Sequence, residues 1–266
     1  MRFRFGDNWQ SYAKRIGEEE IAEAKRSLVS LLGNDLAGRR FLDVGSGSGL
    51  FSLAARRLGA EVFSFDYDAD SVACTKGLRA KYSLDDRDWK IEQGSILDDA
   101  YLTRLGQFDI IYSWGVLHHT GAVWSAVDKA ASLVAPGGLL AIALYRRTPL
   151  CRAWHIEKRF YANAPHAVQW VIRSLYITGY FSRLMLRGRS PIAYVKNYNS
   201  LRGMDFWHDT HDWLGGYPYE SVRPDEVREH LTALGFIDFR SVTHKAGLGL
   251  FGTGCDEYVW KKPSRG

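Results

Sequence analysis

A glycine-rich segment is the first place in this chain where residue types and spacing suggest a binding site. Residues 43–49 read DVGSGSG and follow directly on an apolar run that begins at Phe41. Glycines at such a place let the backbone turn sharply and approach a ligand closely. The spacing is G-x-G-x-G, whereas a dinucleotide fingerprint needs its third glycine at position 50, which is Leu50. The loop therefore disfavours NAD.

An acid in the next strand completes the pattern. Asp66 ends a predicted strand and lies 21 residues after Gly45. A carboxylate at that place can accept hydrogen bonds from both ribose hydroxyls of a nucleoside. Together, the loop and the acid predict a nucleoside ligand whose polar tail lies over the glycines, with or without phosphate.

A second group of polar residues could carry a reaction, and it reads HDTHDW from His208 onward. If the segment is helical, His208 and His211 share a face and, with Asp209 and Asp212, could ligate a divalent metal. The same side chains could instead supply a general base. The structural alternative is a loop in which Asp212 caps or pairs with an arginine and Trp213 packs on the core. No carboxylate-rich strand motif supports a metal, so we predict none and keep Asp212 and His211 as catalytic candidates.

The elements that must position these residues are visible in the apolar pattern. Short apolar runs predict strands at 41–44, 61–65, 89–93, 108–113 and 139–145, and helical spacing marks 8–32, 50–58, 69–82 and 124–134, with a turn at 135–138. Repeated alternation of strand and helix predicts a parallel sheet with helices on both faces.

The end of the chain departs from this alternation. A helix at 224–234 is followed by strands at 236–243 and 255–261, which a glycine-rich connection at 247–254 joins. A connection that short makes the two strands antiparallel. We therefore predict an α/β fold with a seven-stranded, mostly parallel sheet that closes with a C-terminal antiparallel hairpin.

An inserted segment carries most of the positive charge. Residues 147–203 hold ten Lys or Arg and one acid, Glu157, so their net charge is +9 within a chain of net charge +5. Nine aromatic residues are interleaved with these charges. We predict that residues 1–146 and 222–266 form the ligand-binding domain, with a helical N-terminal segment at 1–34. Residues 147–221 form a basic, aromatic, mainly helical insertion, the lid segment.

Composition limits the class of protein. The chain has 266 residues, 46% of them hydrophobic and 24% charged, which suits one large α/β domain or one domain with an insertion. Three distant cysteines without a CxxC pair predict neither a zinc site nor a disulfide framework. The first residues contain no apolar stretch typical of a secretory signal, and the longest uncharged run, 110–127, is a poor membrane span. We expect a soluble, cytoplasmic protein.

Taken in order, five motifs resemble those of the class I S-adenosylmethionine-dependent methyltransferases. They are FLDVGSGSG at 41–49, the acid Asp66, GSILD at 94–98, FDIIYSWGVLHH at 108–119 and PGG at 136–138. The resemblance covers residues 41–145 well and the closing hairpin moderately. It implies a Rossmann-like class I methyltransferase fold, S-adenosyl-L-methionine as the cofactor, and methyl transfer as the reaction.

The resemblance also implies a cofactor site. Its predicted members are Trp9, Tyr12, Asp43, Gly45, Ser46, Gly47, Asp66, Tyr67, Ser95, Ile96, Ser113 and Trp114. Asp43 would face the methionine ammonium group, directly or through water, and Asp66 would bind the ribose. Ser95 would bond the adenine edge between Tyr67 and Ile96. A helix cap at Asp43 and a turn residue at Ser95 are the structural alternatives.

In this family the exit of the fourth strand faces the sulfur of the cofactor. His119 lies there, at a position that relatives often fill with histidine, and an imidazole could take a proton from a hydroxyl acceptor. The alternative is that His118 or His119 caps the next helix or bonds the loop. The segment with Trp9 and Tyr12 is similar to the part that closes over the methionine end in relatives.

The lid segment sets the expectation for the acceptor. A basic, aromatic lid predicts an anionic or sugar-like acceptor, or contact with a membrane surface. A helical cap on the sheet, with arginines that reach solvent, is the structural alternative. We predict methyl transfer to oxygen on a small molecule, a glycan or a lipid-linked sugar, in the cytoplasm or at the inner membrane surface. An RNA (tRNA or rRNA) methyltransferase and a cofactor-binding regulatory module without activity are the alternatives. No dedicated nucleic-acid motif supports RNA.

Overall fold

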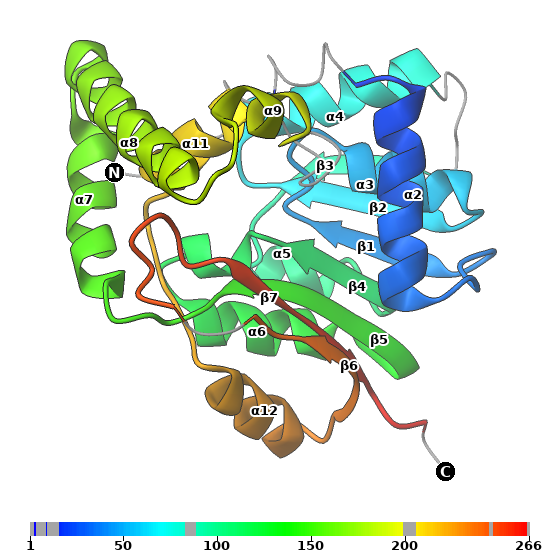
Figure 1. Ribbon diagram of the computed structural model, residues 1–266. Coiled ribbons are helices and arrows are strands. Elements are labelled where there is room, and N and C mark those ends of the chain that lie inside the picture. The colour runs from blue at the N-terminus through cyan, green and yellow to red at the C-terminus, as the bar shows by residue number, and fades with distance from the viewer. Residues whose placement is uncertain are drawn as a thin grey trace.

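The computed structural model describes residues 3, 9, 16–82, 89–198, 206–244 and 247–264. Within these residues, seven strands form one sheet in the order β3-β2-β1-β4-β5-β7-β6 (Figure 1). The strands are β1 (Arg40–Val44), β2 (Glu61–Asp66), β3 (Trp89–Gln93), β4 (Phe108–Trp114), β5 (Val134–Tyr145), β6 (Ile237–Val242) and β7 (Cys255–Lys261). The first five pair in parallel, and β7 is antiparallel to both β5 and β6. The predicted seven-stranded α/β fold with its closing hairpin is confirmed.

Helices cover both faces of the sheet because successive strand residues point to opposite sides. In β1, Phe41 belongs to one buried apolar cluster and Leu42 to the other. The first cluster lies under α2 (Glu18–Leu32), α3 (Leu50–Arg57) and α4 (Ala69–Tyr82). The second lies under α5 (Asp99–Thr103), α6 (Val123–Ser132) and α12 (Pro224–Ala233). Burial on both faces explains why these strands read as nearly continuous apolar runs.

A third group of helices lies beyond the carboxyl ends of the parallel strands (Figure 1). These are α7 (Cys151–Asn163), α8 (His166–Leu186), α9 (Pro191–Lys196) and α11 (Phe206–Gly215). All four fall in the predicted lid segment, and α7 contacts both α8 and α11. The HDTHDW residues lie inside α11, so the alternative of a loop at this position is wrong. The division of the chain into two units stays a prediction.

The structure corrects several expected boundaries. Residues 135–138, predicted as a turn, belong to β5, where the register passes from Phe108 opposite Val134 to Ile110 opposite Leu139. The extra residues form a bulge that the end of β7 covers, because Lys262 N donates to Gly138 O at 2.9 Å. The short helix α5 and the 3₁₀ turn Leu117–His119 were not predicted, since elements of five and three residues show no periodicity. The described N-terminal helix begins at Glu18.

Candidate active site

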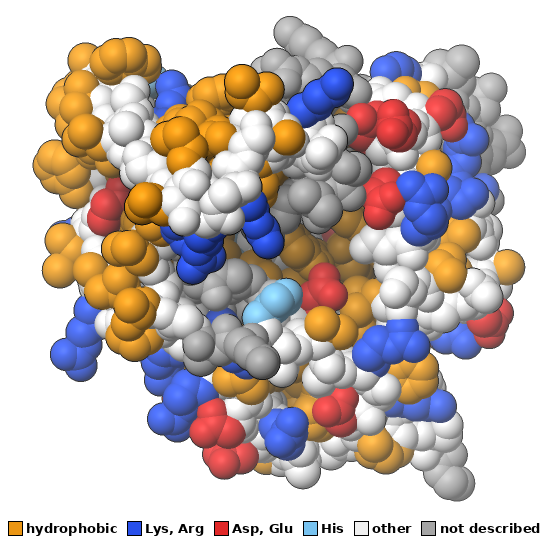
Figure 2. All heavy atoms as spheres, viewed as in Figure 1, with side chains coloured by type: hydrophobic (Ala, Val, Ile, Leu, Met, Phe, Trp, Pro, Cys, Tyr) orange, Lys and Arg blue, Asp and Glu red, His pale blue; other side chains and the backbone are white. Residues whose placement is uncertain are grey.

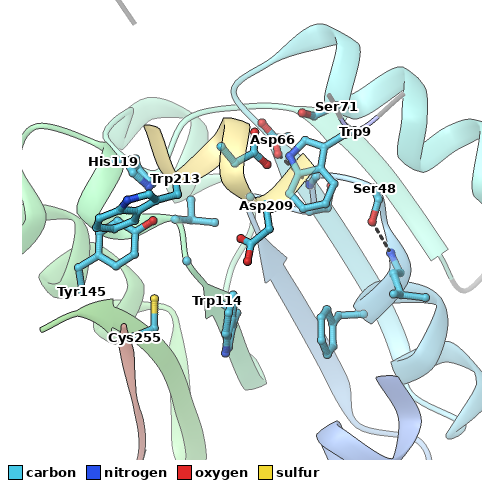
Figure 3. Close-up of a pocket in the computed structure, with 18 of the residues that line it drawn as sticks. Trp9, Ser48, Asp66, Ser71, Trp114, His119, Tyr145, Asp209, Trp213 and Cys255 are labelled. Carbon is cyan, nitrogen blue, oxygen red and sulfur yellow. Dashed lines mark hydrogen bonds between the residues drawn. The ribbon is translucent and has the colours of Figure 1, made fainter. Parts of the chain in front are cut away.

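A cavity of about 1000 Å³ lies at the carboxyl ends of β1, β2 and β4 and is bounded on its other side by α11 (Figure 3). Of the residues predicted from the sequence, the cavity is lined by Trp9, Asp43, Gly45, Ser46, Gly47, Asp66, Tyr67, Ser95, Ile96, Trp114, His119 and Asp212. The fold therefore brings together groups from both ends of the chain. Tyr12, also predicted here, lies outside the described residues.

The glycine loop takes a conformation that only glycine adopts easily. Gly45 has φ +80° and Gly47 has φ +54°, both in the left-handed region. A Cβ at Gly45 would lie 2.5 Å from Val116 Cγ1, and one at Gly47 would lie 3.0 Å from the Trp9 indole. These two glycines thus allow the backbone to turn, and they also leave room for Val116 and Trp9 to pack against the loop. The N–H of Gly45 donates to Phe65 O at 2.8 Å, which ties the loop to the end of β2.

Backbone hydrogen bonds orient Asp66 at the end of β2. Its Oδ2 accepts from Gly47 N at 3.0 Å, and its Oδ1 accepts from Asp68 N at 2.9 Å. A carboxylate offers about four acceptor positions, so it can hold the loop and also accept hydroxyl groups. Figure 3 shows Asp66 beside Trp9 at one end of the cavity. Ser95 accepts from Leu97 N at 3.1 Å, so its side chain stabilises a turn as well as lining the cavity.

Asp43 is almost fully buried, with 3% of its surface exposed. Its Oδ2 accepts from the Ser52 hydroxyl, which lies 2.7 Å from Ser64 Oγ. Burial raises the pKa of Asp43 to about 7, against the hydrogen bond from Ser52 and with added repulsion from Asp66. The following helix has Gly49 as its N-cap and no side-chain cap, so the alternative of a capping role is wrong. A buried carboxylate close to losing its charge is suited to a cationic partner.

His119 closes the other end of the cavity and is only 4% exposed. Its Nδ1 lies 2.7 Å from Pro218 O. A carbonyl oxygen only accepts, so Nδ1 carries a proton, and in the neutral ring Nε2 therefore carries the lone pair. The N-cap residue of the following helix, α6, makes no side-chain hydrogen bond. The N–H of Val123, the first residue of α6, donates to Glu220 Oε2 at 3.0 Å. Helix capping by a histidine is therefore wrong, and His119 has the tautomer that a base requires.

Aromatic side chains form the wall next to His119. The Tyr145 ring lies 5.3 Å from the His119 ring and 5.4 Å from Trp213, each edge to face. The Lys158 ammonium, fully buried, lies 3.7 Å from the Trp213 ring centroid and supports it from behind. Asp209 reaches from α11 toward the middle of the cavity (Figure 3). From the sequence, Trp213 was expected to pack on the core and Asp209 to be a metal ligand or a general base, whereas Tyr145 was not among the predicted site residues.

Two predicted site residues do not reach the cavity. Ser113 is fully buried and donates to Val44 O at 3.0 Å, which joins β4 to β1. His211 Nδ1 lies 2.8 Å from the Tyr161 hydroxyl, on the side of α11 that faces α7. Burial, with the nearby Arg173 charge, lowers the pKa of His211 to about 4. Across the described residues, no three His, Cys, Asp or Glu side chains come close enough to hold a metal.

The charge of the cavity is opposite to that of the lid segment. The described lining includes several acids, among them Asp43, Asp66, Asp209, Asp212 and Glu257, but no Lys or Arg. The described basic side chains of the lid segment thus do not line the cavity. Arg183, for example, lies over the Phe251 ring at 5.3 Å. This distribution argues against the anionic acceptor expected from the lid charge.

Sequence comparison identifies relatives for this architecture. The family model described as a methyltransferase domain matches residues 16–185, more than half of the chain. A ubiquinone biosynthesis O-methyltransferase from Nitrobacter winogradskyi is 30% identical over 142 residues, 53% of this chain and 49% of the relative. The enzyme of the same name from Brucella ovis is 29% identical over 196 residues, 71% of this chain and 75% of the relative.

Solved structures show the same fold at low sequence identity. The magnesium protoporphyrin IX methyltransferase of Synechocystis, with bound SAH, has a TM-score of 0.54 at 14% identity. The match covers 92% of this chain and 82% of the Synechocystis chain. An O-methyltransferase family protein from Burkholderia thailandensis has a TM-score of 0.55 at 14% identity. The match covers 90% of this chain and 55% of the Burkholderia chain. At such identity the likeness concerns the fold.

Proposed function

This chain belongs to the methyltransferase domain family, and we infer that it is an S-adenosylmethionine-dependent enzyme. On that premise, we propose that it methylates a hydroxyl oxygen of an uncharged acceptor, such as a sugar or another hydroxyl-bearing small molecule. The observation that carries the proposal is the tautomer of His119, whose Nδ1 donates to Pro218 O and whose Nε2 can therefore accept a proton. The O-methyltransferase names of the relatives support oxygen as the acceptor atom.

The Asp43 and Asp66 end of the cavity fits the cofactor. When bound, S-adenosylmethionine supplies a methyl group activated by a positive sulfonium. Asp43 would hold its ammonium group, because a buried carboxylate with a raised pKa gains most from a cation. Asp66 would accept from the ribose hydroxyls, and Ile96 would pack on the adenine. Trp9, next to Gly47, would cover the methionine end.

The acceptor end performs alignment and proton removal. His119 Nε2 would take the hydroxyl proton while the acceptor oxygen bonds to the methyl carbon. Bound S-adenosylmethionine would supply this methyl group, and the electron pair of its methyl–sulfur bond would remain with the departing thioether, so the transfer needs no further reactant. Pro218 O, which accepts from Nδ1, would stabilise the imidazolium that results. Tyr145 and Trp213 offer flat apolar faces, and Asp209 offers a carboxylate that accepts from acceptor hydroxyls.

A lipid-linked sugar belongs to this proposal for a structural reason. Helix α8 contributes Tyr176 and Tyr180 to the cavity lining and carries exposed apolar residues such as Leu175. An acceptor whose lipid stays outside the cavity would thus meet apolar surface on the same helix.

Methyl transfer to acceptor panels tests the proposal. Labelled S-adenosylmethionine is offered with neutral sugars and phenols, with amines, with carboxylic acids and with RNA. We expect label on the hydroxyl acceptors in an alkali-stable ether linkage. His119→Gln should lower kcat about 10²- to 10⁴-fold and leave cofactor affinity unchanged.

The matched control is His230→Gln, which changes a histidine on the distant helix α12 that lies 2.6 Å from Asp128. It should leave kcat unchanged. Label on nitrogen or RNA, cofactor binding without transfer to any panel, or full turnover by His119→Gln would overturn the proposal.

A further inference from the structure

Exposed apolar side chains gather on the outer surface of the lid segment (Figure 2). The most prominent, each more than half exposed, are Ile156, Phe160, Trp170, Leu175, Leu186 and Ile192 on α7, α8 and α9. We call this surface the outer apolar face. Contiguous exposed apolar surface of this kind marks a docking site on a soluble domain.

Core packing explains only part of the apolar residues of α8. Of its 21 residues, only Leu184 is buried. Val168, Val171 and Leu175 follow one another at spacings of three and four residues, so they share one face of the helix, and that face is exposed. A helix whose apolar stripe points to solvent needs a partner outside the fold.

The charge around the outer apolar face has one sign. Arg152, Arg159, Arg187, Arg189 and Lys196 are exposed on α7 to α9 or just after them. No described ion pair involves any of these five. The acid of this stretch, Glu157, is partly buried, and burial raises the pKa of its carboxyl group against the attraction of the neighbouring Lys158. The face therefore complements an anionic apolar partner.

A shallow hollow of about 540 Å³ lies where α7 ends and α8 begins. Its lining combines Ile156, Phe160 and Val168 with the basic Arg159. In this hollow an apolar wall lies next to a guanidinium group. This arrangement matches the boundary of a bilayer, where lipid chains meet phosphate headgroups. Within the described part of the chain, no helix has the length and hydrophobicity to cross a bilayer, so contact would be at the surface.

From these observations we propose that the outer apolar face docks on a bilayer that contains anionic phospholipids. Apolar side chains such as Leu175 and Leu186 would enter the headgroup boundary, and the arginines would bind lipid phosphates. A second copy of the chain is disfavoured, because a two-fold contact sets the same positive patch against itself.

Docking in this way would bring the cavity close to the lipid. Tyr176 and Tyr180 line the cavity from the same helix that carries Leu175 on its outer side. Figure 2 shows the hollowed region of the molecule next to the hydrophobic side chains of this face. The surface is nonetheless separate from the reacting groups, so lipid binding can be measured without methyl transfer.

Vesicle co-sedimentation tests the proposal with the full chain. Vesicles of phosphatidylcholine alone are compared with vesicles of phosphatidylcholine mixed with phosphatidylglycerol. We expect binding to the mixed vesicles only. The double variant Leu175→Glu with Leu186→Glu should weaken this binding roughly tenfold or more, because it puts two charges on the inserted face.

The matched control is Ile237→Glu with Phe239→Glu, which adds the same charge on exposed apolar residues of β6. It should bind the mixed vesicles like the unchanged protein. Circular dichroism and S-adenosylmethionine affinity, equal in all three proteins, show that each is folded. Equal vesicle binding by both double variants, no vesicle binding at all, or a dimer in solution that Leu175→Glu dissociates would overturn the proposal.

Discussion

Single buried carboxylates decide how the cavity responds to pH. Burial raises the pKa of Asp43 to about 7 from the usual 3.8, so without ligand it keeps a proton that the unfolded chain has released. The contribution of Asp43 to folding stability therefore falls as pH rises from 3.8, the usual pKa, to about 7, the pKa in the folded protein. A cation in the cavity favours the charged carboxylate and reverses this preference.

We accordingly predict that S-adenosylmethionine affinity rises with pH up to about 7 and then levels off. The limit for one released proton is about tenfold per pH unit. Calorimetry over this range measures the slope. Asp43→Asn should bind more weakly and lose the slope, whereas Asp35→Asn, at an exposed carboxylate, should keep it. An unchanged slope in Asp43→Asn would contradict the role of Asp43.

At the residue scale, the sequence predicted which residues line the cavity better than it predicted the hydrogen bonds that these residues make. Asp66 and His119 line the cavity as expected, because Asp66 is the last residue of β2 and His119 lies in the 3₁₀ turn that follows β4. Ser113 was misplaced because neighbouring strand residues alternate in direction: Trp114 reaches the cavity and Ser113 bonds the next strand. The hydrogen bond that fixes the His119 tautomer is accepted by Pro218 O, 99 residues later, and no local pattern predicts it.

At the scale of the element, the orientation of α11 divides HDTHDW into two faces. Asp209, Asp212 and Trp213 line the cavity, while His211 turns toward Tyr161. The sequence showed both i, i+3 pairs but could not show which one faces inward, because that depends on how α7 packs behind α11. Of the two candidates kept from this segment, Asp212 lines the cavity and His211 does not.

This orientation predicts a role for Asp209 in acceptor binding. Asp209→Asn keeps the shape but loses the charge, so hydrogen bonds from acceptor hydroxyls weaken, and KM for the acceptor should rise about fivefold. Cofactor affinity should stay the same. His208→Asn, on the same helix, changes a residue that does not line the cavity and serves as the control. A fall in kcat with unchanged KM would argue against acceptor contact.

The loop after β1 gives a prediction about stability. Gly45→Ala places a Cβ at a φ of +80° and 2.5 Å from Val116, whereas Gly235→Ala has nearly the same φ, +81°, with open space around it. Left-handed strain costs about 1–2 kcal/mol in both variants, and overpacking adds about 1–3 kcal/mol at Gly45 alone. Urea unfolding measures the difference, and adding Val116→Ala should recover it. Equal losses in the two single variants would show that the overlap is harmless.

At the scale of the whole molecule, the net charge of +5 is an average over two unlike surfaces. The sequence located the positive charge in the lid segment but could not tell its inner side from its outer side. Side chains such as Tyr176 and Tyr180 face the cavity, and charged ones such as Arg187 stay in solvent, because an unpaired buried charge is costly. An anionic acceptor stays a prediction, and the described lining of the cavity does not support it.

Two unlike surfaces should respond differently to salt. Ions screen exposed charges over about 10 Å at 0.1 M, so vesicle binding through the exposed arginines should weaken steeply as salt rises. Asp43 is 3% exposed, and S-adenosylmethionine affinity should therefore change little over the same series. Both affinities are measured on one preparation from low to high salt. A parallel decline of the two would mean that one electrostatic surface governs both, against the separation of outer apolar face and cavity.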